Sequence, residues 1–86
     1  MQKDYDAWWR IDNIDTIDSP SLVIYTERVL ANIRTAKDMV RDVTLLRPHV
    51  KTHKSREASL LQISEGITKF KCATIAEAEM LALAGA

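Results

Sequence analysis

The side chains best suited to chemistry lie in one short stretch, residues 47–55, which reads RPHVKTHKS. Alternate side chains of a strand share a face, so a strand here would align Arg47, His49, Lys51 and His53. An amine crowded by cationic groups and partly shielded from water loses its proton more readily and becomes a nucleophile toward carbonyl compounds. Its neighbours would attract phosphate and carboxylate groups, and one histidine could move protons near neutral pH. The pattern therefore predicts that Lys51 forms a Schiff base inside a closed pocket.

Three other interpretations of this stretch stay open from the pattern alone. The basic residues could form the solvated face of an edge strand, which Pro48 would fit because it lacks an N–H. His49 and His53 could bind a metal, but positions i and i+4 of a strand lie roughly 13 Å apart, and no third ligand is visible. Residues 28–56 carry a net charge of +6 and could bind an anion or nucleic acid, although no aromatic residue is interleaved with the basic ones.

The elements that must position these side chains alternate between strands and helices. Short apolar, partly β-branched runs predict strands, and apolar residues at helical spacing predict helices. Thr26, Ser55 and Thr74 are predicted N-caps. Thr74 begins a capping box with Glu77, and Gly66 is a predicted helix stop. The sequence predicts strands over residues 22–25, 43–52 and 70–73, and helices over 26–41, 55–65 and 74–85.

This alternation of strands and helices predicts an α/β fold built from parallel βαβ units. Parallel sheets are covered on both faces or closed into a barrel, and such barrels place active sites where their strands end. Lys51 falls at such a position. We therefore expect the N-terminal βαβα segment of a (β/α)8, TIM-type barrel. A complete barrel takes about 250 residues, so a chain of 86 is expected to be truncated.

Composition and charge exclude several classes of protein. The 12 basic and 12 acidic residues cancel, which argues against generic binding to nucleic acid or to a membrane surface. No apolar run approaches the ~20 residues of a membrane-spanning helix, and no secretory signal follows the N-terminus. The single cysteine, Cys72, cannot form an internal disulfide and is predicted to be buried in its short strand. The expected compartment is the reducing cytoplasm.

Residues 1–17 are expected to form an N-terminal arm, distinct from the strand–helix units of residues 18–86. Five aspartates against two basic residues give residues 1–20 a net charge of −3, and aspartates favour turns. Trp8 and Trp9 are predicted to anchor the arm on an apolar surface.

The stretch over residues 47–54, RPHVKTHK, closely resembles the R-P-H-x-K-T-H-K segment of the D-threonine aldolase and D-serine dehydratase group. These are fold-type III enzymes that use pyridoxal 5'-phosphate (PLP), and their barrel is similar to the N-terminal domain of alanine racemase. Residues 18–25 are similar to the opening strand of that group and the entry to its first helix, and residues 72–79 to its second strand and the helix that follows. The resemblance covers residues 18–86.

The resemblance implies that Lys51, which directly follows the apolar Val50, carries PLP as a Schiff base, with Lys54 as the weaker candidate. Arg47, His49 and His53 would then have supporting roles near cofactor and substrate. The implied substrates are D-amino acids or β-hydroxy-D-amino acids, and the reaction could be that of an aldolase, a dehydratase or a racemase. A non-catalytic PLP-binding protein of the same fold is the alternative.

The resemblance also implies partners that lie outside this chain. Full-length members of the group use a divalent metal, zinc or manganese, whose ligands lie near their C-terminus, so no metal ligand is assigned here. They are commonly homodimers, and neither nucleic acid nor a membrane is an expected partner. The chain by itself is expected to be catalytically inert.

Overall fold

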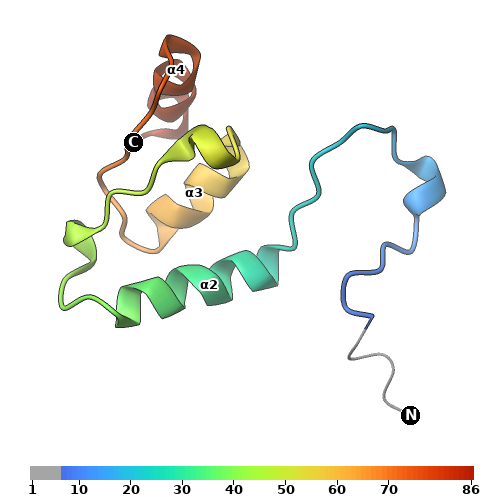
Figure 1. Ribbon diagram of the computed structural model, residues 1–86, viewed down its shortest axis with the longest axis horizontal. Helices are drawn as coiled ribbons and strands as arrows, with labels where there is room; N and C mark the ends of the chain where they lie inside the picture. Colours follow the sequence, from blue (N-terminus) through green and yellow to red (C-terminus); the bar gives the residue numbers. More distant parts are fainter. Residues whose placement is uncertain (1–6) are drawn as a thin grey trace.

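The computed structural model describes residues 7–86, which form three α-helices and three short 3-10 turns. Figure 1 shows the helices in the green-to-red part of the chain, after a long blue-to-cyan arm that contains one 3-10 turn. In chain order the elements are η1 (Ile14–Thr16), α2 (Thr26–Asp38), η2 (Val43–Leu45), η3 (Val50–Thr52), α3 (Arg56–Ser64) and α4 (Ile75–Ala84).

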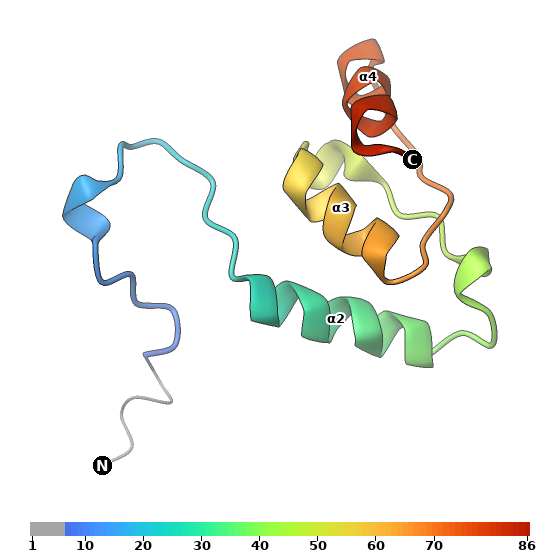
Figure 2. The ribbon, with the colours of Figure 1, turned by 180° about the vertical axis from the view of Figure 1, so that it is seen from behind.

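The three helices form an open stack rather than a closed domain. Helix α3 packs against both α2 and α4, and α4 stands at the far side of α3 from α2 (Figures 1 and 2). The radius of gyration of the Cα atoms is 15.2 Å, whereas a compact domain of this length would have about 12 Å. The chain is therefore more extended than a compact domain of the same length.

Two of the three predicted N-caps are confirmed. Ser55 Oγ accepts a hydrogen bond from the Ala58 N–H at 3.1 Å, which caps α3. Thr74 Oγ1 accepts from the Glu77 N–H at 3.1 Å, which caps α4. Each hydroxyl satisfies a backbone N–H that has no partner within its own helix. Short-range sequence chemistry thus sets where both of these helices begin.

The third predicted N-cap, Thr26, is wrong. Thr26 is the first residue of α2, and Tyr25 occupies the cap position without a side-chain cap hydrogen bond within the described chain.

Gly66 is confirmed as the stop of α3: it follows the C-cap residue Glu65 and has a φ of +96°. That left-handed conformation strains any residue with a Cβ, so glycine suits the position.

The predicted strands do not form within residues 7–86. Residues 22–25 are extended but unpaired, and residues 43–52 contain the two 3-10 turns η2 and η3. What remains of the predicted parallel pairing is one isolated bridge between His49 and Lys71. A strand requires a neighbour to receive its backbone hydrogen bonds, and the described residues supply that neighbour only at the bridge. The barrel itself stays a prediction.

Local hydrogen bonding explains why residues 43–45 turn instead of extending. The Asp42 carboxylate accepts the Thr44 N–H at 2.9 Å and thereby caps η2. Hydrogen bonds from Thr44, first of all from its backbone N–H, lower the pKa of Asp42 below its ordinary value.

Cys72 is exposed, so the prediction that it is buried is wrong. With a single bridge at Lys71, no second layer covers this segment.

The buried core is small and lies between the helices and the segment that precedes α3. Val50 and Ser59 are completely buried. The other buried apolar residues are Ile33, Ala58, Ile67, Leu81 and Ala84. Many large apolar side chains are exposed instead, among them Leu22, Val23, Met39, Leu45, Ile75 and Leu83. Within residues 7–86 no helix has the length and apolarity to cross a membrane.

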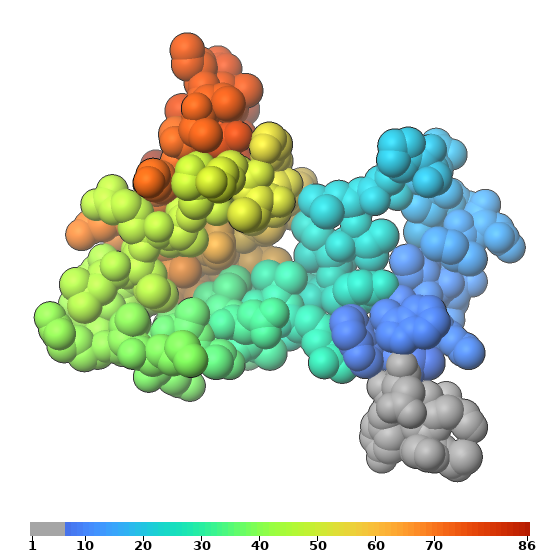
Figure 3. All heavy atoms as spheres, in the orientation of Figure 1, coloured from blue at the N-terminus to red at the C-terminus, as the bar shows by residue number. Residues whose placement is uncertain are grey.

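The arm meets the rest of the chain at one aromatic cluster. The Trp8 ring packs edge-on against Tyr25, with 5.1 Å between ring centroids, and the Arg28 guanidinium lies 3.9 Å from the Trp8 centroid. The Tyr25 hydroxyl donates a hydrogen bond to the Trp9 carbonyl. The space-filling view shows this contact between the start of the arm and the start of α2 (Figure 3). Trp8 therefore contacts the start of α2, but both tryptophans are exposed, Trp8 by 46% and Trp9 by 54%, so their burial against an apolar surface is not seen in residues 7–86.

Candidate functional site

The turn η3 is tied to the segment before α4 by backbone hydrogen bonds. The Val50 N–H donates to the Lys71 carbonyl at 2.9 Å, and the Lys71 N–H donates to the Pro48 carbonyl at 2.9 Å. Val50, which is fully buried, lies directly before Lys51. The parallel bridge and the buried Val50 together fix the backbone position from which the Lys51 side chain projects.

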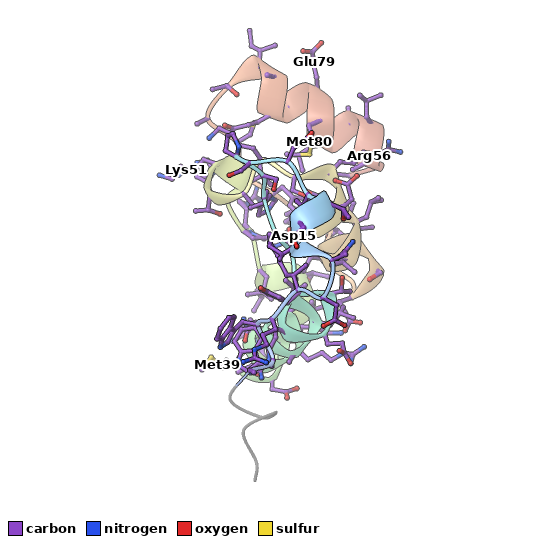
Figure 4. All side chains as sticks on the ribbon, turned by 90° about the vertical axis from the view of Figure 1, so that its right-hand side faces the viewer. Asp15, Met39, Lys51, Arg56, Glu79 and Met80 are labelled. Carbon is purple, nitrogen blue, oxygen red and sulfur yellow. The ribbon has the colours of Figure 1, made fainter. Side chains whose placement is uncertain are left out.

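Lys51 is exposed, and its side chain points away from the three helices (Figure 4). Within the described residues its ammonium forms no ion pair, and Lys51 does not line either of the hollows that lie beside α2. The prediction that Lys51 lies in a closed pocket is therefore wrong for residues 7–86. No later element of the described chain folds over the end of η3 to form the walls of such a pocket.

The predicted common face of Arg47, His49, Lys51 and His53 is also wrong. Val50–Thr52 is a 3-10 turn, and with three residues per turn neighbouring side chains no longer alternate between two faces. The turn begins because His49 Nδ1 accepts the Lys51 N–H at 3.1 Å. His49 therefore contacts the backbone N–H of Lys51 and not the amine at the end of its side chain.

His53 faces a different pocket, of about 370 Å³, bounded by residues 22–25 and by α2. Its Nδ1 accepts the Ser55 N–H at 2.9 Å, which places the proton of the neutral ring on Nε2. Nε2 is buried and has no hydrogen-bond partner within the described residues. Burial disfavours the charged ring and so lowers the pKa of His53.

Arg47 lies at a third place. It lines a hollow of about 360 Å³ between the segment before η3 and α2, together with Ala36, Leu46 and Ile67. The structure therefore brings His49 and Lys51 together but separates Arg47 and His53 from them. Within residues 7–86 no three His, Cys, Asp or Glu side chains gather closely enough to hold a metal ion.

Lys54, just after η3, and Glu77, in the first turn of α4, both lie next to Lys51 in the chain of contacts. Sequence reasoning gave Glu77 only a capping role and made Lys54 only the weaker candidate for the cofactor. Lys54 Nζ donates to the Lys51 carbonyl at 2.9 Å and lies 3.6 Å from Glu77 Oε2. Glu77 is buried, and its Oε1 accepts the Ala73 N–H at 2.8 Å. The capping-box spacing predicted Glu77 at the start of α4, but no local signal connects it with Lys54, 23 positions earlier in the sequence.

The electrostatics of Glu77 follow from these contacts. The hydrogen bond from the Ala73 N–H lowers the pKa of Glu77 most, and the nearby charge of Lys54 lowers it further. The carboxylate is therefore ionised at neutral pH although its side chain is almost inaccessible to solvent. Lys54 is thus engaged by a buried carboxylate, while the neighbouring amine of Lys51 is free. The two neighbouring lysines therefore differ in their contacts within the described residues.

One comparison with known proteins found a relative of this chain, and that relative is a dehydratase. Over 75 residues the chain is 37% identical to such an enzyme, and the match covers 86% of the chain. The relative is D-threo-3-hydroxyaspartate dehydratase of Delftia sp. (strain HT23). The chain spans about a fifth of the length of this relative, 20%. No family model and no solved structure matches the chain.

Proposed function

We propose that this chain is the N-terminal part of a PLP-dependent enzyme that eliminates water from a β-hydroxy-D-amino acid, with Lys51 as the lysine that bears the cofactor. The observation that carries the proposal is the likeness of this chain to such enzymes: residues 47–54 resemble their lysine-bearing segment, and the chain is 37% identical over 75 residues to a dehydratase. The amine of Lys51, which is exposed and forms no ion pair within the described residues, is accessible to the cofactor.

The described residues suit one half of a PLP site. An exposed primary amine without an ion pair can condense with an aldehyde, with loss of one water. His49 Nδ1 holds the N–H of Lys51 and so orients the backbone that carries this amine. PLP, when bound, supplies an electron sink for the carbanionic centre of the substrate. The residues that would hold its phosphate are not among those we assign in this chain.

The substrate class comes from the relative, whose name specifies a D-amino acid with a hydroxyl group on Cβ. Loss of that hydroxyl as water, followed by hydrolysis, converts such a substrate to a 2-oxo acid and ammonia. An aldolase would instead break the Cα–Cβ bond and yield glycine and an aldehyde. A racemase would return the amino acid with inverted Cα.

The rest of the proposed enzyme would cover the apolar surface that the described residues leave exposed. Leu22, Val23 and Ile75 are exposed by 64%, 43% and 81%. Apolar faces of this kind are expected where further strands and helices of a (β/α)8 barrel would pack. The divalent metal, zinc or manganese, and a second subunit would likewise contact residues other than the turn around Lys51.

The test uses the full-length protein that contains this chain. Purified protein is incubated with PLP and reduced with borohydride, and peptide mass spectrometry then locates the pyridoxyl group. We expect it on Lys51 in the wild type, and we expect Lys51→Ala to lose both the visible absorbance of lysine-bound PLP and activity. Lys71→Ala, which removes a neighbouring exposed amine, is the matched control and should retain both.

Products from D-threo-3-hydroxyaspartate then identify the reaction. A 2-oxo acid with ammonia supports the dehydratase, whereas glycine with an aldehyde, or the inverted amino acid, would replace it by an aldolase or racemase. Retention of PLP without any product would favour the non-catalytic PLP-binding protein. A pyridoxyl group that is absent from Lys51 in the wild type would contradict the proposal altogether.

A further inference from the structure

We infer that Lys54 and Glu77 together are positioning residues for Lys51: they fix the carbonyl group of Lys51, so that only its side chain is free to move. This inference rests on the proposed function, because it gives a role to the backbone of the lysine that bears the cofactor. Neither residue contacts the Lys51 amine; both act through the peptide group that follows Lys51.

The backbone of Lys51 is held on both sides. On the N-terminal side, His49 Nδ1 accepts the Lys51 N–H at 3.1 Å. On the C-terminal side, the Lys51 carbonyl accepts a hydrogen bond from Lys54 Nζ at 2.9 Å. With both polar backbone groups engaged, rotation about the φ and ψ bonds of Lys51 would break at least one hydrogen bond.

The contact from Lys54 is anchored at its other end in the helix stack. Lys54 Nζ lies 3.6 Å from Glu77 Oε2, and the Glu77 side chain is only 4% exposed. Glu77 Oε1 in turn accepts the Ala73 N–H at 2.8 Å, and the Glu77 N–H is bound by the Thr74 cap. The carbonyl of Lys51 is therefore connected through one ammonium group to the rigid start of α4.

The backbone conformation of Lys54 supports the same conclusion. Its φ is +51°, in the left-handed region that residues with a Cβ rarely adopt. Such a conformation persists only where surrounding contacts compensate its cost. Here the Lys54 N–H donates to the Val50 carbonyl at 2.8 Å, while its side chain reaches Lys51 and Glu77. This conformation lets the Lys54 side chain reach back over the turn.

The ion pair is suited to positioning because both partners depend on it. The ammonium of Lys54 is fairly exposed, but the carboxylate of Glu77 is not, so loss of Lys54 would leave a buried charge with fewer partners. Loss of Glu77 would free Lys54 to extend into solvent. Either change should release the Lys51 carbonyl, so we expect the two substitutions to be equivalent rather than additive.

The variants are made in the full-length protein. Lys54→Met removes the charge but keeps the length of the side chain, Glu77→Gln keeps the shape but removes the charge, and Lys54→Arg keeps the charge. The matched control is Glu65→Gln, which breaks the ion pairs of Glu65 with Arg34 and Lys37, each 3.2 Å long, between α2 and α3. Thermal unfolding confirms that each variant is folded.

Two readouts are combined. The first is the rate at which added PLP becomes attached to Lys51, followed by absorbance and located by borohydride reduction. We expect Lys54→Met and Glu77→Gln to slow it by roughly 10- to 100-fold, as misplacement of a reacting group does. The double variant should be no slower than either single variant, Lys54→Arg should recover most of the rate, and Glu65→Gln should match the wild type.

The second readout needs no PLP. Amide hydrogen exchange of the peptide that contains residues 50–55 should become faster in Lys54→Met and Glu77→Gln but not in Glu65→Gln. Unchanged exchange and unchanged attachment rates in both variants would overturn the inference while leaving Lys51 as the cofactor-bearing lysine. A wild-type protein in which Lys51 never receives the pyridoxyl group would instead refute the proposed function, and this inference with it.

Discussion

The turn around Lys51 and the N-terminal arm are attached to the helices in different ways. At the turn, the hydrogen bonds of Val50 and Lys71 and the ion pair of Lys54 join segments about 20 residues apart in the sequence. The arm contacts the start of α2 mainly through the rings of Trp8 and Tyr25. The comparison teaches that the region held by hydrogen bonds and an ion pair is the one in which the proposed cofactor-bearing lysine lies.

The same substitution, made once at the turn and once in the segment that joins the arm to α2, should show the largest difference. Val50→Ala removes two fully buried methyl groups next to Lys51 and should lower the free energy of unfolding by about 2 kcal/mol. Val23→Ala, at a side chain that is 43% exposed, should lower it by less than about 0.5 kcal/mol. Urea unfolding of the two variants measures the difference. Equal effects would mean that the turn is no better packed than the segment next to the arm.

A second pair of variants compares the starts of two helices. Thr74→Ala removes the hydroxyl that caps α4 and should cost about 1 kcal/mol. Thr26→Ala at the start of α2 should have little effect, because its side chain is not the cap. Circular dichroism during urea unfolding reports both changes. A larger loss for Thr26→Ala would contradict the assignment of the caps.

The attachment of the arm is tested at Arg28. Arg28→Met removes the guanidinium that lies over the Trp8 ring and should weaken the contact by about 0.5–1 kcal/mol. Limited proteolysis should then cut the arm sooner, and tryptophan fluorescence should shift toward that of solvated indole. Lys37→Met, farther along α2, is the control. The rate of PLP attachment to Lys51 should stay unchanged, since the described part of the arm contacts the start of α2 and not the turn.

The smallest expected effect is a dependence of stability on pH at His53. Its pKa is lowered by burial, so the folded protein resists protonation that the unfolded chain accepts. The resulting stability is present above the ordinary pKa of about 6.5 and decreases as the pH falls below it. The urea midpoint should therefore fall between about pH 7 and pH 5. His53→Gln should show a weaker dependence, and an identical one would exclude His53 as its source.

Local features of the sequence predicted the helices well. The apolar spacing over residues 29–40 predicted α2, although the helix ends at Asp38, three residues before the predicted end. The hydroxyls of Ser55 and Thr74 placed the starts of α3 and α4, because a cap involves residues only three positions apart. Gly66 marked the end of α3 because the residue after a helix often takes a positive φ, which suits glycine. Such interactions can be read from a short window of sequence.

The parts that sequence reasoning missed depend on contacts between distant residues. The strands over residues 43–52 and 70–73 needed partners that only the His49–Lys71 bridge supplies, so β-branched composition alone overestimated them. The contact between Lys54 and Glu77 could not be recognised because it joins a turn to a helix start. Of the predicted site, His49 contacts Lys51 only through the backbone N–H of Lys51, whereas Arg47 and His53 lie elsewhere.

The small side chain of Ser59 between α3 and α4 has a consequence for the turn. Ser59 is fully buried, and its hydroxyl lies 3.6 Å from the sulfur of Met80 in α4, so the two helices meet at this residue. A bulky residue at position 59 would act as a wedge and tilt α4. Because Glu77 belongs to α4, that tilt would draw its carboxylate away from Lys54. Side-chain size inside the helix pair thus governs how accurately a distant amine is presented.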